Sequence, residues 1–137
     1  MADKKISELT AATALDGTEP LPIVQAGETR KATVAQLSTG RIVTDATSAR
    51  TMTAADNGRV IRFTSATPVT VSCPTGLAVG FNCTFIQIGA GKVTIAAGAG
   101  ATLQAYSNLV STIGANAVAS VMNVGSEVFI ATGNLGV

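Results

Sequence analysis

The segment from Gly58 to Gly100 constrains the fold more than any other part of this 137-residue chain. It reads GRVIRFTSATPVTVSCPTGLAVGFNCTFIQIGAGKVTIAAGAG, in which short runs of Val, Ile, Phe and Thr are separated by turns that contain Pro or Gly. Short β-branched and aromatic runs between turn residues are typical of β-strands. The pattern predicts consecutive antiparallel strands.

We therefore expect an all-β fold, with a single β-sandwich or barrel-like domain of about six to eight short antiparallel strands over residues 51–137. An extended N-terminal arm and connector over residues 1–50 should precede it. The length suits one core, because a domain of about 150 residues buries roughly two-thirds of its unfolded surface. The expected core residues alternate along the apolar runs: Ile61, Phe63, Val69, Val71, Phe81, Phe85, Val93, Ile95, Val121 and Ile130.

Local signals divide the region before Gly58. Residues 21–25, LPIVQ, predict a short strand, Ala26-Gly27-Glu28 a turn, and Thr33 to Leu37 a short helix with capping-box spacing. Thr53, with Asp56 three residues later and Gly58 as a stop, predicts at most one helical turn before a strand that begins at Arg59.

Charge is distributed unevenly along the chain. Charged residues make up 12% of the sequence, and only Lys92 and Glu127 follow Phe63. A sheet surface so poor in charge favours an oligomer in which a neighbouring chain covers part of it, with a monomer coated by Thr and Ser as the alternative. A net charge of +1 without basic clusters argues against nucleic acid and membrane partners.

Cysteine and glycine motifs give no cofactor site. Cys73 and Cys83 flank PTGLAVG and share the apolar parity, so we interpret them as buried free thiols rather than as a disulfide across a hairpin. The chain has no His, and two thiols alone do not complete a zinc site. GAGKVT at residues 89–94 matches neither nucleotide-binding pattern, and we interpret it as a hairpin turn that needs positive φ.

The N-terminal segment KISELTAATALDGTEPLPIVQAGETRKATVAQL resembles a leader of tailed-bacteriophage virion proteins. The shared features are a KISEL-like opening, a DG-x-E segment followed by a Pro-containing apolar run, a Gly turn, a basic pair and a final Leu. Such leaders occur on head, tail and fibre proteins alike. The resemblance therefore implies a phage particle without specifying which part of it.

A second likeness covers about half of the chain. TMTAADNGRVIRF and the segment from VTVSCPTGLAVGFNCTFIQ to GAGATL resemble a β-module of phage tail fibres and capsid-associated proteins. Related modules often close with an aromatic strand, whereas this chain ends in EVFIATGNLGV and contains no Trp.

These resemblances imply a phage particle protein, and the short chain with no Trp favours a capsid decoration (cement) protein that binds the outside of the shell after synthesis in the host cytoplasm. The implied partner is the major capsid protein, and the implied assembly is a homotrimer. The alternative is a tail-fibre, baseplate or head-fibre component that binds the host surface. The arm should contact the capsid through apolar anchors and a basic pair: Ile6, Leu9, Leu21, Ile23, Val24, Arg30 and Lys31.

Residues 117–121, AVASV, are small or apolar on both faces of a predicted strand. Such a strand is covered on both faces, either by the two sheets of a sandwich or by a neighbouring subunit, and we expect Val118 and Val121 at a subunit interface. Tyr106 is interpreted as partly buried with its hydroxyl outward, and an exposed recognition residue is the alternative. Titratable groups after residue 62 are too few for paired carboxylates or for a Cys nucleophile with a base, so we expect no catalytic residues and no enzyme.

Overall fold

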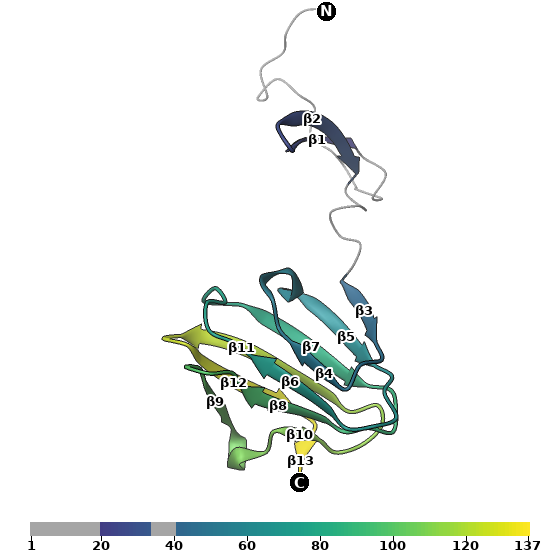
Figure 1. Cartoon of the computed structure of the whole chain (residues 1–137), viewed down its shortest axis with the longest axis vertical. Coiled ribbons are helices and arrows are strands. Elements are labelled where there is room, and N and C mark those ends of the chain that lie inside the picture. The colour runs from purple at the N-terminus through teal and green to yellow at the C-terminus, as the bar shows by residue number, and fades with distance from the viewer. Residues whose placement is uncertain (1–19, 34–40) are drawn as a thin grey trace, which may run out of the picture. The chain divides into compact units, whose positions relative to one another are not determined.

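Figure 1 shows the computed structural model of the chain, which describes residues 20–33 and 41–137. The chain divides into two compact units, residues 1–39 and residues 40–137. The expected all-β fold is confirmed, because the regular elements of the described residues are strands and two short 3-10 turns. The second unit begins before residue 51, since strands at residues 42–45 and 49–51 pair with later strands of that unit.

The first unit contains a two-stranded antiparallel hairpin. Strand β1 (Pro20–Gln25) pairs with β2 (Glu28–Thr33) around a two-residue turn. Ala26 and Gly27 both have positive φ, at 54° and 80°, as a type I′ hairpin turn requires. The predicted strand and turn are confirmed. Thr33, where the helix was expected to begin, is the last residue of strand β2. The other residues of that expected helix, up to Leu37, lie outside the described residues.

The second unit has eleven strands within residues 41–137, more than the sequence indicated. Their bounds are β3 Ile42–Asp45, β4 Ala49–Thr51, β5 Arg59–Phe63, β6 Val69–Cys73, β7 Asn82–Gln87, β8 Val93–Ala97, β9 Thr102–Ala105, β10 Ser111–Thr112, β11 Val118–Gly125, β12 Val128–Gly133 and β13 Leu135–Gly136. The 3-10 turns are η2 Ala54–Asp56 and η3 Tyr106–Asn108. The turn expected at Thr53 and the strand expected from Arg59 are both present.

Two sheets form the layers of a sandwich (Figure 1). The six-stranded sheet has the order β3-β5-β7-β11-β12-β9, and the five-stranded sheet has the order β13-β10-β8-β6-β4. Inward side chains of both sheets meet in one buried cluster that includes four Phe rings and two Cys residues. Phe63 and Phe85 pack at a ring-centroid distance of 6.1 Å. The hydrophobic area that this whole cluster buries is the main source of stability for a domain of this kind.

The strand direction in the first part of the unit differs from the antiparallel expectation. Strands β3, β5 and β7 are parallel to one another, as are β4, β6 and β8. Each loop crosses to the opposite sheet, so the opposite strand serves as the connection that parallel pairing requires. Three solenoid-like coils result, stacked in register, with Ile61 beside Phe85 and Val71 beside Ile95. Antiparallel pairing begins only with β10 and β11.

The GAG motif is a corner between coils and not a hairpin turn. Neither Gly89 nor Gly91 has positive φ, in contrast to the prediction. A Cβ on Gly89 would overlap the carbonyl oxygen of Ser65, and one on Gly91 would overlap that of Thr67. Glycine is required here because the corner after β7 stacks directly on the backbone of the corner after β5.

Nine of the ten expected core residues are buried. Ile130 is the exception, because it is only partly buried and faces outward, while Phe129 is fully buried in its place. The hairpin turn explains the difference. It is formed by Ser126 and Glu127, with φ of 52° and 57°, and a bulge precedes it, so that Val121 pairs with Ala131 and not with Ile130. A shift of one residue moves every β12 side chain to the other face.

Candidate docking surface

The two outer faces of the sandwich differ in chemistry. The five-stranded sheet presents small side chains with hydroxyl groups, aligned across neighbouring strands by the in-register pairing. Thr94 and Ser111 form a hydrogen bond of 2.9 Å on this face. The outward residues of strands β4, β6, β8 and β10 include Thr51, Thr70, Ser72, Thr94, Ala96 and Ser111. Such a face is well suited to contact with water.

The outer face of the six-stranded sheet carries an apolar patch on β11 and β12, while Arg62 of β5 is exposed on the same face. On β11 the inward residues Ala119 and Val121 alternate with the outward residues Val118, Met122 and Val124. Met122 and Val124 are each 50% exposed. Exposed large apolar side chains gathered on one face mark interaction sites more often than isolated ones do.

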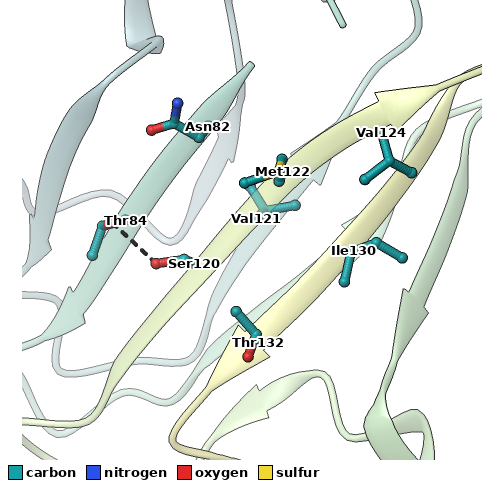
Figure 2. A pocket seen from close by; sticks show the side chains of 8 residues that line it. All are labelled: Asn82, Thr84, Ser120, Val121, Met122, Val124, Ile130 and Thr132. Atoms are coloured by element: carbon teal, nitrogen blue, oxygen red, sulfur yellow. Dashed lines mark hydrogen bonds between the residues drawn. The ribbon is translucent and has the colours of Figure 1, made fainter. Parts of the chain in front are cut away.

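A groove of about 340 Å³ lies on this face (Figure 2). We call it the apolar groove, and its lining residues come from β7, β11 and β12: Asn82, Thr84, Ser120, Val121, Met122, Val124, Ile130 and Thr132. A hydrogen bond of 3.0 Å joins the hydroxyls of Thr84 and Ser120 in the groove. None of the lining residues carries a charge.

Both charged residues that follow Phe63 are engaged elsewhere. The Lys92 ammonium donates a hydrogen bond to the carbonyl oxygen of Val137 at 2.7 Å. The Glu127 carboxylate accepts one from the backbone N–H of Gly76 at 3.1 Å. The apolar groove therefore offers van der Waals contact and neutral hydrogen-bonding groups, which suit an uncharged protein surface.

One of the two expected interface residues lies on the outer face. Val118 is exposed beside the groove-lining residues of β11, whereas Val121 is 1% exposed and packs in the core. The expectation for Val121 is wrong because β11 alternates strictly, so that only one of its faces is outward. Met122, Val124 and Ile130 were missed, and the alternation of NAVASVMNV was the signal that marked the first two.

Tyr106 is 89% exposed, so the expectation of partial burial is also wrong. It directly follows β9, whose last residue Ala105 pairs with Ala131. Tyr106 and Thr132 line one small depression, and Thr132 also lines the apolar groove. The ring thus stands at the border of the apolar face.

The expected arm contacts fall in two groups. Leu21 and Val24 on β1 are exposed and Ile23 is half-buried, while Arg30 and Lys31 on β2 are exposed. Ile6 and Leu9 lie outside the described residues. The hairpin therefore brings the apolar run and the basic pair of the arm into register on adjacent strands.

An ion cluster that the sequence did not reveal closes one end of the sandwich. Arg50 donates to Asp45 at 2.7 Å and to Asp56 at 2.6 Å. Asp56 also accepts from the backbone N–H of Thr53 at 2.9 Å. Both carboxylates are buried, and by register Asp45 lies beside Phe63 and Arg50 beside Val71. The cluster therefore covers the core beneath the edge strands β3 and β4.

The electrostatics of this cluster indicate a structural role. Burial by itself would raise the pKa of Asp56, but the hydrogen bonds from Thr53 and Arg50 and the positive charge of Arg50 outweigh it and lower the pKa. The pKa of Asp45 is lowered in the same way by Thr47 and Arg50. Carboxylates held ionised by fixed partners are poor general acids at neutral pH.

The two thiols are free and buried, as expected, but they lie on opposite sheets. Residues 74–81 cross from one sheet to the other, so β6 and β7 do not form the hairpin that was considered between the two cysteines. Burial raises the pKa of Cys73 to about 11, and burial together with the charge of Asp56 raises that of Cys83 to about 12. Both therefore remain protonated at physiological pH.

Neither thiol is expected to react with a thiol-specific reagent at pH 8 until the protein unfolds, because the thiolate is the nucleophile. Labelling by iodoacetamide should be absent in buffer and should reach two groups per chain in urea. The intact mass before reduction should equal the mass after reduction. Rapid labelling of the native protein, or a mass lower by two hydrogens, would contradict the buried-thiol assignment.

Comparisons with known proteins give no relative. No known protein family matches the chain, and a search of curated proteins finds no match. Residues 20–33 and 41–137 include no helix with the length and apolar character that a membrane span needs. Within the same residues, no group of three or more His, Cys, Asp or Glu side chains is placed to hold a metal ion. The outer face of the six-stranded sheet therefore stands as the candidate functional surface on geometry alone.

Proposed function

We propose that this protein is a bacteriophage capsid decoration protein, which binds the outside of the shell and stabilises the virion as a homotrimer. The observation that carries the proposal is the contrast between the two outer faces of the sandwich. One face is coated with hydroxyl groups, and the other carries an apolar patch around a groove that has no charged lining residue. A domain that is bound to a protein shell exposes one face to water and buries another face against neighbouring chains. The leader-like arm supplies the link to phage particles.

The arm is proposed to be the anchor on the major capsid protein. An isolated two-stranded hairpin is only marginally stable in water, so β1 and β2 gain stability by docking. Leu21 and Val24 offer apolar contact, and Arg30 and Lys31 offer charge for shell carboxylates. Three arms on one trimer would reinforce one another, since tethering raises the effective concentration of each further attachment.

Binding rather than catalysis is proposed for the second unit. Its buried carboxylates are committed to Arg50, and its thiols are protonated. The described surface has no basic cluster on the outer faces of the sheets that would favour nucleic acid or a membrane.

A tail-fibre, baseplate or head-fibre component that binds the host surface is the second candidate. Tyr106 favours it, because an exposed aromatic ring is what a stacking contact with a sugar requires. The location of the protein on the particle separates the two candidates.

Removing residues 1–39 is expected to leave a folded β-unit that no longer binds phage particles. The sandwich has its own core, whereas the proposed anchor lies in the first unit. Circular dichroism would check the fold, and co-sedimentation with particles that lack the protein would check binding. A matched variant with Leu21→Ser, Val24→Ser, Arg30→Ser and Lys31→Ser should behave like the truncation.

Full binding by the truncated protein would contradict the anchor role of the arm. The stabilising role is tested by heating particles with and without the full chain and measuring genome release. Particles that carry the protein should release their genome at a higher temperature. Equal release temperatures would contradict the cement function while leaving the location on the shell intact.

A further inference from the structure

A protruding aromatic ring and an unfilled groove are both exposed on this chain, the ring at the edge just after β9 and the groove on β7, β11 and β12. Tyr106 is the only aromatic residue with an exposed ring, because the four Phe residues are buried and there is no Trp. Its ring does not fill the apolar groove of its own chain, since 89% of the residue is exposed. We propose that Tyr106 of one copy inserts into the apolar groove of the next copy.

The groove and the ring match in chemistry. Met122, Val124 and Ile130 form its apolar wall, and a thioether beside an aromatic ring is a favourable contact. Asn82, Thr84 and Ser120 line the rest of the groove with neutral amide and hydroxyl groups (Figure 2). A tyrosine needs this combination, with an apolar surface for the ring and a polar partner for its hydroxyl.

The turn that carries Tyr106 is preorganised for insertion. Ser107 and Asn108 both have positive φ, at 52° and 56°, and the backbone N–H of Leu109 donates to the carbonyl oxygen of Tyr106 at 3.1 Å. Consecutive non-glycine residues in this region are strained and persist only where the surroundings hold them. A rigid aromatic residue also loses little conformational entropy on binding.

A second copy of this chain suits the groove better than the arm hairpin does. Glu28, Arg30 and Lys31 are exposed on that hairpin and would be placed against a groove that has no charged lining residue. Burial of unpaired charge is costly, so an uncharged occupant is favoured. The depression beside Tyr106 has no charged lining residue, and the other residues that line it are Leu109, Ala131, Thr132, Gly133 and Leu135.

The size of the face is also adequate. β11 has eight residues, which at about 3.3 Å each extend about 26 Å, and six strands about 4.8 Å apart span about 24 Å. The whole face is thus on the order of 600 Å², near the roughly 800 Å² per partner of a standard interface. Tyr106 and the groove are different parts of the surface, so the contact is heterologous, and the homotrimer requires that three such contacts close into a ring. The inference rests on the proposed function only in requiring that copies associate.

A pair of introduced cysteines tests this contact. In the full chain, Tyr106→Cys combined with Met122→Cys should form disulfide-linked oligomers under mild oxidation, visible on a non-reducing gel. Tyr106→Cys combined with Thr70→Cys is the matched control, because Thr70 is exposed on the outer face of the other sheet. The control pair should stay unlinked. The native thiols do not interfere, because both are buried. Equal cross-linking of the two pairs would overturn the proposal.

Association without cross-linking gives an independent measurement. Tyr106→Ala should weaken self-association by about 10- to 30-fold, the effect of an interface hot spot, and Tyr106→Phe by only a few-fold. Because the side chain is exposed, the circular dichroism spectrum of both variants should match that of the parent. Unchanged self-association of Tyr106→Ala in native mass spectrometry would refute the Tyr106 contact but not the homotrimer or particle binding. A monomeric parent protein would refute both the contact and the homotrimer.

Discussion

Replacing Asp56 with alanine is expected to lower the free energy of unfolding by about 3 kcal/mol. The change removes a buried carboxylate that binds Arg50 and the backbone of Thr53, and it leaves the Arg50 charge only partly compensated. Urea denaturation followed by circular dichroism would measure it. Arg62→Ala is the matched control, because Arg62 is exposed on the outer face, and it should change stability by less than about 0.5 kcal/mol. A loss below about 1 kcal/mol for Asp56→Ala would contradict a stabilising cluster.

The same cluster predicts acid sensitivity. The pKa values of Asp45 and Asp56 are lowered in the folded protein from an ordinary value of 3.8. Their contribution is therefore fully present above that value and is lost as pH falls through the lower folded pKa. The parent should lose stability below about pH 5, and Asp45→Asn combined with Asp56→Asn should lose much less over the same range. Parallel pH profiles for the two proteins would exclude these carboxylates as the cause.

Replacing Gly91 with alanine is expected to destabilise the protein by about 3 kcal/mol or more, or to prevent folding. The added Cβ would overlap the carbonyl oxygen of Thr67, and a backbone atom cannot move aside as a flexible side chain can. Gly114→Ala is the control, since no atom lies within 4 Å of a Cβ added there, and it should be neutral or slightly stabilising. Thermal unfolding of both variants separates the two outcomes. Equal melting temperatures would contradict the close stacking of the coil corners.

The sequence predicted which residues point inward better than it predicted which strands pair. Alternation alone placed Ile61, Phe63, Val69 and Val71 correctly in the core, because burial on one face imposes period two on any strand. The parallel direction was missed because residues 64–68 can serve equally as a hairpin loop or as a crossing to a facing sheet. Alternation is the same in both arrangements.

The candidate docking surface was predicted only in outline. The small and apolar residues of AVASV drew attention to β11, but Val121 was expected at an interface because this run looks apolar on both faces. Tyr106 could not be placed, since its exposure depends on two positive-φ residues that have no glycine to signal them. The ion cluster was missed because Asp45, Arg50 and Asp56 meet only when β3 and β4 lie on opposite sheets.

The copy number of this protein in purified phage particles tests the decoration function most directly. Quantitative mass spectrometry against isotope-labelled peptides of this chain and of the major capsid protein would measure the ratio of the two. A decoration protein should be present in numbers of the same order as the capsid subunits, and in multiples of three if trimers bind. A few copies per particle would contradict the decoration function and place the protein on the tail or a fibre.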